Sequence, residues 1–124
     1  MKNTALVMIG SNLDAESNIS LAIQHLSDIF TVEKMSSCLS SKPVGDKYKS
    51  PFHNKAIRII STLDYENTII SFKEIERKLG RTPESKQSGL VTMDIDLIFW
   101  NGEQVHRDYD RFPFVKKCID QLND

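Results

Sequence analysis

Two aspartates, Asp94 and Asp96, lie two residues apart in an otherwise apolar segment, TMDIDLIFW at 92–100. On a β-strand alternate side chains share a face, so both carboxylates would project from one side with their roots about 7 Å apart. Like charges this close repel each other unless a cation lies between them. Magnesium prefers oxygen ligands and often combines carboxylates with substrate phosphates, so the pair predicts a magnesium–phosphate site. The alternative is a solvated edge strand whose acids prevent aggregation.

The residues that alternate with these acids favour the first interpretation. The opposite face of the strand is expected to carry Met93, Ile95, Leu97 and Phe99, while Ile98 shares the face of the two acids. An apolar face of this kind is typical of a strand packed against a core. The segment is therefore predicted to be a central strand whose acids face a site.

Three further motifs carry polar groups or backbone that a ligand could use. GSNL at 10–13 follows an apolar run, and a small turn there lets backbone approach a ligand closely. Glu76 and Arg81 lie at the end of a predicted helix, where Arg81 either pairs with phosphate or is an ordinary helix-end charge. In PFHN, Phe52 offers an aromatic face and Asn54 offers an amide that could hydrogen-bond the edge of a heterocycle. The alternative is that Phe52 is a core residue and Asn54 a turn residue.

The elements that must position these residues follow from periodicity and from turn signals. The order is strand, helix, strand, strand, helix, strand, with predicted ranges 4–10, 15–30, 31–40, 55–63, 65–80 and 92–100. A short strand in 103–106 and a short helix after Pro113 complete the chain. This order predicts an α+β, ferredoxin-like βαββαβ fold in a single domain over residues 1–124. The antiparallel sheet would carry its helices on one face and leave the other face free for a site.

Composition excludes several classes of partner. Among 124 residues there are 16 Lys and Arg against 17 Asp and Glu, so no charge excess favours nucleic acid or an anionic membrane. No apolar run approaches the roughly 20 residues of a membrane span. Two cysteines, Cys38 and Cys118, lack a CxxC spacing, so reduced thiols in a cytoplasmic protein are expected. The three histidines are scattered and predict no zinc site.

Taken together, the motifs resemble the hydroxymethyl-dihydropterin pyrophosphokinase family over residues from about 4 to 105. The resemblance rests on the order and spacing of five segments, IGSNL at 9–13, KPVG at 42–45, FHNKA at 52–56, EIERKLGR at 74–81 and TMDIDLIFWNGE at 92–103. It implies a ferredoxin-like fold and transfer of pyrophosphate from ATP to the hydroxymethyl group of a pterin, with release of AMP.

The resemblance also implies roles for individual residues. Asp94 and Asp96 would bind two magnesium ions that bridge the ATP phosphates, and Arg81 would contact phosphate during the reaction. Glu76 would lie in the nucleotide pocket. The pterin pocket would be formed by Asn54, which hydrogen-bonds the pterin, by Phe52 in place of a family Tyr, by Val44 and by backbone near Ser41.

Several positions depart from the family pattern. Ser88 replaces a Trp that stacks on the pterin, and Val91 and Pro83 replace loop arginines. After the acidic strand the family has a PHP-like segment and further basic residues, whereas this chain runs HRDYDRFPFVKKCIDQLND. Four tail cations are candidates to substitute for them, Arg107, Arg111, Lys116 and Lys117. Two alternatives therefore stay open beside an active enzyme: a catalytically degenerate homologue that binds nucleotide, metal or a partner, and an interaction domain that shares only the fold.

Overall fold

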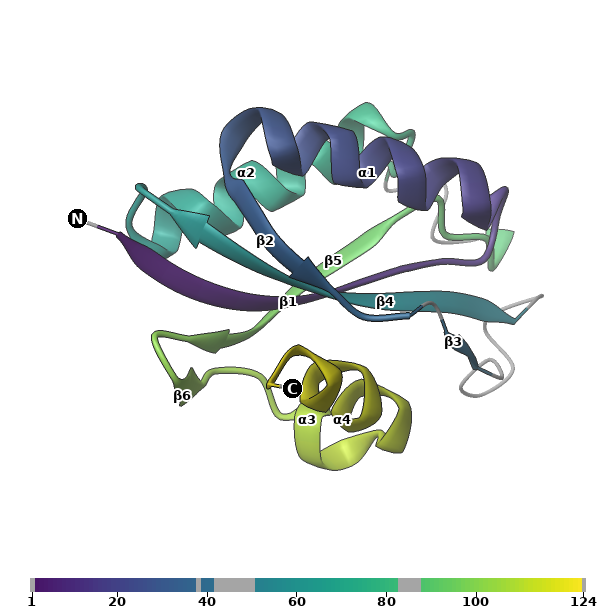
Figure 1. Ribbon diagram of the computed structural model, residues 1–124. Coiled ribbons are helices and arrows are strands. Elements are labelled where there is room, and N and C mark those ends of the chain that lie inside the picture. The colour runs from purple at the N-terminus through teal and green to yellow at the C-terminus, as the bar shows by residue number, and fades with distance from the viewer. Residues whose placement is uncertain (1, 38, 42–50, 83–87, 124) are drawn as a thin grey trace.

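In the computed structural model the chain folds into an antiparallel sheet with helices on both faces (Figure 1). The structure describes residues 2–37, 39–41, 51–82 and 88–123. The sheet has the order β2-β4-β1-β5-β6, and β3 pairs with β4. Its strands are β1 (Asn3–Ser11), β2 (Thr31–Met35), β3 (Leu39–Ser41), β4 (Phe52–Ser61), β5 (Asp94–Trp100) and β6 (Glu103–Gln104). The helices are α1 (Ala15–Ile29), α2 (Tyr65–Lys78), α3 (Asp108–Arg111) and α4 (Pro113–Asp120), followed by a 3-10 helix η2 (Gln121–Asn123). The predicted ferredoxin-like βαββαβ fold is confirmed by this order and pairing.

Helices α1 and α2 cover one face of the sheet, as the sequence predicts (Figure 1). Their apolar sides meet alternate residues of the central strands, including Val7, Ile59 and Ile95, which are at most 2% exposed. Phe30 and Phe72 lie edge to face at 5.7 Å between the two helices. Each side chain buried in this way contributes about 1.5–3 kcal/mol, so this layer fixes the sheet that carries the acids.

The ends of α2 are set by local signals in the sequence. The Asp64 carboxylate accepts a hydrogen bond from the backbone N–H of Asn67 at 2.8 Å, which satisfies one of the N–H groups that the first turn leaves without a helical partner. Gly80 follows the helix with φ of 98°, a conformation that favours glycine. None of the helices among the described residues combines the length and the apolar character that crossing a membrane requires.

The opposite face of the sheet is partly covered by α3 and α4, so the prediction that it is left free is wrong for that part (Figure 1). The apolar side of α4 and η2 packs on Met8, Ala56 and Ile98 through Val115, Cys118, Ile119 and Leu122. The Arg58 Nη1 group donates to the Leu122 carbonyl at 2.9 Å and holds the end of this helical segment. The sequence predicted a short helix after Pro113 but did not identify the surface that this helix covers.

Strand β5 contains a β-bulge that changes the direction of its last side chains. Leu6 pairs with Phe99 and Val7 with Leu97, so Ile98 has no single partner on β1. One extra residue shifts the alternation by one position. Ile98 faces the α4 side as predicted, but Phe99 also packs there, and Trp100 turns to the α1–α2 side. The prediction that Phe99 shares a face with Ile95 is therefore wrong.

Candidate active site

The two acids face the same side of the sheet as Asn54, across three neighbouring strands. Asp94 pairs with Gly10 of β1, and Gly10 pairs on its other side with Asn54 of β4. Directly paired residues share a face, and neighbouring strands lie about 4.8 Å apart, so the outer two backbones are about 10 Å apart. Asp96 is next to this row, opposite Met8. The fold thus brings the predicted metal ligands and the predicted pterin-binding amide onto one surface.

Gly10, in the middle of this row, is required by the position of the Asn54 side chain. A Cβ on Gly10 would lie 2.9 Å from Asn54 Oδ1, closer than real Cβ contacts allow, and 3.7 Å from the Phe52 ring. The Asn54 side chain is buried, and its Nδ2 group donates to the Leu39 carbonyl at 3.3 Å. The predicted close approach at this glycine is therefore made by the side chain of Asn54. Phe52 begins the same strand and is half-buried beside it.

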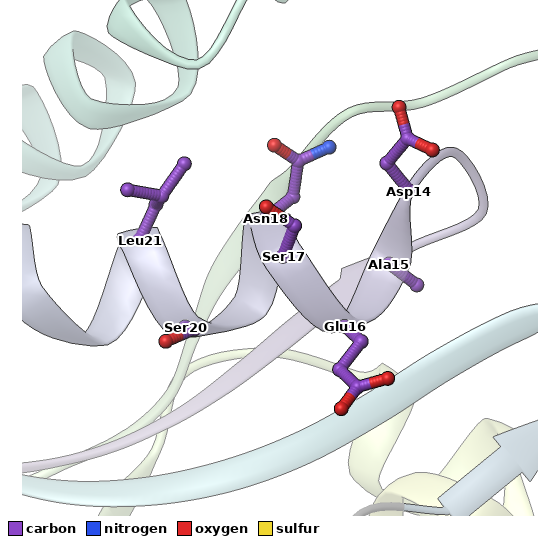
Figure 2. A pocket seen from close by; sticks show the side chains of 7 residues that line it. All are labelled: Asp14, Ala15, Glu16, Ser17, Asn18, Ser20 and Leu21. Atoms are coloured by element: carbon purple, nitrogen blue, oxygen red, sulfur yellow. The ribbon is translucent and has the colours of Figure 1, made fainter.

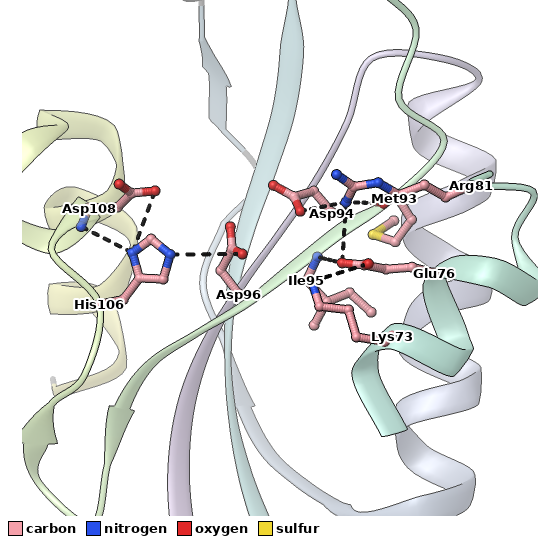
Figure 3. A network of polar contacts seen from close by, with 9 residues as sticks. All are labelled: Lys73, Glu76, Arg81, Met93, Asp94, Ile95, Asp96, His106 and Asp108. Atoms are coloured by element: carbon pink, nitrogen blue, oxygen red, sulfur yellow. Dashed lines mark hydrogen bonds and ion pairs between the residues drawn. The ribbon is translucent and has the colours of Figure 1, made fainter. Parts of the chain in front are cut away.

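Arg81 partly neutralises the acid pair (Figure 3). Its Nη1 group lies 2.7 Å from Asp94 Oδ1 and 3.4 Å from Glu76 Oε2, and it also donates to the Met93 carbonyl at 3.3 Å. The sequence predicted that Arg81 would contact phosphate. In the structure Arg81 contacts the Asp94 carboxylate, which is a predicted ligand of the metal ion that would bind phosphate. A guanidinium here has N–H groups directed along the acidic edge, where further anionic oxygens would lie.

Glu76 is buried and supports the strand between the two acids. Its Oε2 atom accepts a hydrogen bond from the Ile95 amide at 2.7 Å, and its Oε1 atom lies 3.5 Å from Lys73 Nζ. Strand β6 pairs with β5 only at Phe99 and Trp100, so Glu76 replaces a strand partner for Ile95. Burial raises the pKa of Glu76, and the bond from Ile95 and the nearby cations oppose this shift. Glu76 therefore fixes the backbone that positions both acids.

Asp96 has the properties of a carboxylate that lacks a cation. Burial, and then repulsion by Asp94, raise its pKa to about 8. A divalent ion would remove this penalty because it stabilises the charged form. The oxygen donors of Asp94 and Asp96 suit Mg²⁺, which prefers such ligands and retains several waters. The residues present therefore fit the predicted magnesium site.

His106 and Asp108 join this site, which the sequence reasoning missed. His106 Nε2 lies 4.0 Å from Asp96 Oδ1, and its Nδ1 atom lies 3.6 Å from Asp108 Oδ2 (Figure 3). The cause is the turn at Asn101 and Gly102, whose φ angles of 51° and 83° reverse the chain into a tight hairpin. The Asn-Gly pair was the available signal, because it predicts that the residues after it return beside β5.

A groove of about 240 Å³ opens beside Asp96, between α2 and the β5–β6 hairpin. Its walls are mostly apolar, with Tyr65, Ile69 and Phe72 on the helix side and Leu97 and Val105 on the strand side. Lys73, Asp96 and His106 provide its charged or titratable groups. Such a groove suits a flat base whose phosphates extend toward the acid pair.

A larger open hollow of about 860 Å³ runs along the first turns of α1 (Figure 2). It is lined by seven residues of one segment between Asp14 and Leu21. No predicted site residue within the described ranges lines it. The acid pair and its neighbouring groove are therefore the candidate active site, although the groove is smaller than this hollow.

The GSN motif has a structural role that differs from ligand binding. The Asn12 side chain donates to the Gly89 carbonyl at 3.0 Å and accepts from the Val91 amide, and Ser11 Oγ donates to the Val91 carbonyl at 3.2 Å. These bonds anchor the segment that leads into β5. The Val91 side chain is buried, so this position cannot supply the phosphate-binding cation that the family has there. Ser88 accepts a hydrogen bond from the Leu90 amide at 3.2 Å.

The remaining predicted residues are placed less completely. Ser41 pairs with Phe52 at the end of β3, whereas Val44 and Pro83 lie outside the described residues. Of the tail cations, Lys116 lies 3.1 Å from the Tyr109 hydroxyl and 3.5 Å from Asp120, and Arg111 covers the Phe112 ring at 5.1 Å. Arg107 is exposed beside His106. Of the tail cations, Arg107 is therefore the one adjacent to His106 in the sequence.

Comparison with known proteins found a family model and two bacterial relatives that match most of the chain. The model of the 7,8-dihydro-6-hydroxymethylpterin-pyrophosphokinase (HPPK) family matches residues 6–124. The 2-amino-4-hydroxy-6-hydroxymethyldihydropteridine pyrophosphokinase of Bacillus subtilis (strain 168) is 32% identical over 111 residues, which cover 87% of this chain and 66% of that protein. The protein of the same name from Aquifex aeolicus (strain VF5) is 27% identical over 117 residues, covering 92% and 72%. The chain thus spans about two thirds of the length of these bacterial relatives.

The solved structures add support for the fold. The crystal structure of Plasmodium falciparum HPPK-DHPS with SDX-DHP matches with a TM-score of 0.59 at 11% identity, over 98% of this chain and 37% of that one. At this identity the similarity shows the fold alone. Since the family model matches almost the whole chain, the chain belongs to the 7,8-dihydro-6-hydroxymethylpterin-pyrophosphokinase family.

Proposed function

We propose that this chain transfers pyrophosphate from ATP to 6-hydroxymethyl-7,8-dihydropterin, giving AMP and the pterin diphosphate. The observation that carries the proposal is the row of Asp94, Gly10 and Asn54, which puts the acid pair and a buried amide on one face, with the backbones of Asp94 and Asn54 about 10 Å apart. Membership of the family, and the names of the bacterial relatives, support the same reaction.

In this reaction the pterin hydroxyl oxygen bonds to the β-phosphorus of ATP, and the bond from that phosphorus to the α,β-bridging oxygen breaks. AMP leaves with the bridging oxygen, and the hydroxyl proton passes to solvent. Such transfers depend on positioning and charge neutralisation more than on covalent participation by the protein. Magnesium, two ions in this proposal, would neutralise the phosphates when held by Asp94 and Asp96.

The chain's own residues position the two substrates. The groove beside Asp96 accepts the adenine base, and the phosphates lie near Lys73, which lines the groove, and near Arg81, which contacts Asp94. Glu76 holds the strand between the acids. Asn54 supplies the amide to the pterin edge, with Phe52 beside it and with Val44 and backbone near Ser41 completing the pocket. The substrate partners are thus the small molecules ATP and the pterin.

A second candidate is a homologue that binds magnesium and nucleotide without turnover. It is favoured by the buried Val91 and by Ser88, where the family has an arginine and a tryptophan. One phosphate-binding arginine can contribute about 10³-fold or more to the rate of phosphoryl transfer. A lost stacking partner costs roughly 1–3 kcal/mol, by analogy with base stacking.

Measurement of AMP and pterin diphosphate by chromatography separates the candidates. Purified chain with Mg²⁺, ATP and the hydroxymethyl-dihydropterin should form the two products in equal amounts. Asp94→Asn should reduce the rate by roughly 10³-fold, because a lost charged contact at a transferring phosphate has this size. Asp28→Asn, an exposed acid on α1, is the matched control and should retain the rate. Absence of AMP over a wide range of protein concentration, together with calorimetric binding of a Mg²⁺–nucleotide analogue, would establish the second candidate instead.

A further inference from the structure

A second ligand set for a metal ion lies next to the acid pair and includes a nitrogen donor. Asp96, His106 and Asp108 each offer one ligand atom, and these atoms lie within 4.8 Å of one another. They come from three different segments: strand β5, the chain after β6, and the first position of α3. Figure 3 shows the imidazole between the two carboxylates, with one ring nitrogen facing each.

We propose that Asp96, His106 and Asp108 form a binding site for a divalent transition-metal ion, such as Co²⁺ or Zn²⁺. Bonds from such ions to imidazole nitrogen or carboxylate oxygen are about 2.0–2.2 Å, so ligands of one ion are about 3–4.4 Å apart. An imidazole offers a single ion only one of its two nitrogens, and one atom from each of the three side chains lies within 4.8 Å of the other two, slightly beyond this interval. Side-chain rotations, including a turn of the ring that now faces each carboxylate with a different nitrogen, would bring the three ligands onto one ion.

The chemistry of the donors selects the ion. Imidazole is a good ligand for Zn²⁺ and for the later first-row ions such as Co²⁺, whereas Mg²⁺ takes oxygen ligands and gives up its waters reluctantly. The set of two carboxylates and one imidazole leaves coordination positions open for water or for phosphate oxygens. All three side chains are half-buried, so the ligands are restrained but the ion can enter from the adjoining groove.

In the metal-free molecule His106 has a simpler role that the ion would compete with. Its Nδ1 atom accepts a hydrogen bond from the Asp108 amide at 3.2 Å, at the start of α3. With Nδ1 accepting, the ring carries a hydrogen on Nε2, which faces the Asp96 carboxylate from 4.0 Å, beyond hydrogen-bonding distance. A metal ion bound by the ring would replace one of these two contacts with a coordinate bond.

The inference goes beyond the proposed function, although both use Asp96. The magnesium pair relies on Asp94 and Asp96 and on the phosphates of ATP. The transition-metal site relies on His106 and Asp108 and needs neither substrate. The two proposals can therefore fail independently.

The test is titration of the metal-free chain with Co²⁺, followed by visible absorption, without ATP or pterin. We expect one Co²⁺ per chain, bound at least tenfold more tightly than Mg²⁺ in competition. His106→Ala and Asp108→Asn should each weaken Co²⁺ binding by at least about 10- to 100-fold, since loss of a group that only orients a metal's ligands already costs that much. His25→Ala, a histidine on α1, and Asp110→Asn, an acid on α3 outside the cluster, are the matched controls and should bind as the wild type does.

Asp94→Asn decides between the two ligand sets. If Co²⁺ occupies the proposed site, this variant binds it with an affinity within about threefold of the wild type. If Asp94→Asn loses Co²⁺ while His106→Ala retains it, the ion is held by the acid pair and the proposal is overturned. Equal binding by His106→Ala and wild type also overturns it. Circular dichroism of each variant separates loss of ligands from loss of fold.

Discussion

The two halves of strand β5 perform different tasks, and their difference explains the architecture of the site. Asp94 to Asp96 place like charges two residues apart and require buried Glu76 and the cation Arg81 to hold them. Leu97 to Trp100 are covered on both faces by apolar clusters, with a bulge at Ile98. The first half carries an electrostatic penalty, and the second half supplies packing energy to the same strand. A charged site can therefore exist on a short strand because its other end is anchored.

The largest expected effect is on the anchored half. Ile98→Ala should lower the free energy of unfolding by about 2–5 kcal/mol, since it removes a side chain that is 1% exposed and leaves a cavity. Urea denaturation of the metal-free chain measures this loss. The rate of AMP formation per folded molecule should change little. An equal loss of rate per folded molecule would mean that the two halves are not separate in function.

Glu76 connects the two halves, and its variants should separate charge from hydrogen bonding. Glu76→Ala leaves the Ile95 amide without its partner in a buried position, which costs about 1–3 kcal/mol. Glu76→Gln keeps a carbonyl acceptor and should lose less stability than Glu76→Ala. Both are measured by urea denaturation, with Glu74→Ala on the exposed side of α2 as the control. Equal stability of the Ala and Gln variants would show that the bond to Ile95 contributes nothing.

The charged half should make the stability of the metal-free chain depend on pH. The folded pKa of Asp96, about 8, lies above its ordinary value of 3.8, so the folded state binds this proton more tightly than the unfolded state. The resulting stabilisation is complete below about pH 4 and is lost as the pH rises through the interval to about 8. After a discount for solvent screening, because the side chain is 29% exposed, the change is about 1–2 kcal/mol.

Thermal unfolding of wild type and Asp96→Asn at several pH values measures this contribution. Asp96→Asn should be less sensitive to pH than the wild type between pH 4 and 8, and more stable than it at pH 8.5. A 1 kcal/mol difference corresponds to roughly 2–8 °C in Tm for domains of this size. Identical pH dependence in the two proteins would show that the Asp96 carboxyl is not perturbed by its neighbours.

The smallest expected effect concerns the far end of the site row. Gly10→Ala would place a Cβ 2.9 Å from Asn54 Oδ1 and displace the amide from its position. The pterin KM should rise about tenfold, which corresponds to one lost neutral hydrogen bond, while the ATP KM stays the same. In Asn54→Ala the same Gly10→Ala change should have no further effect on the pterin KM. Additive effects of the two substitutions would contradict this arrangement.

Much of the site could be predicted from short-range pattern. Alternation along 92–97 correctly placed both acids opposite the buried Met93 and Ile95, because this part of the strand is regular. Periodicity and the caps of 65–80 placed Glu76 and Arg81 at one helix end, close to the strand that follows. The family expected from the motif order is confirmed by the match over residues 6–124. The ligand assignments themselves stay predictions.

The sequence by itself determined the order of the elements, the shared face of the two acids and the family, since these depend on local spacing and on motif identity. Only the tertiary structure decided that α4 covers part of the opposite face, that the bulge turns Phe99 away from Ile95, and that His106 and Asp108 meet Asp96. The physical reason is that strand register, bulges and helix docking are set by contacts between distant segments. No local pattern in any one of those segments records its partner.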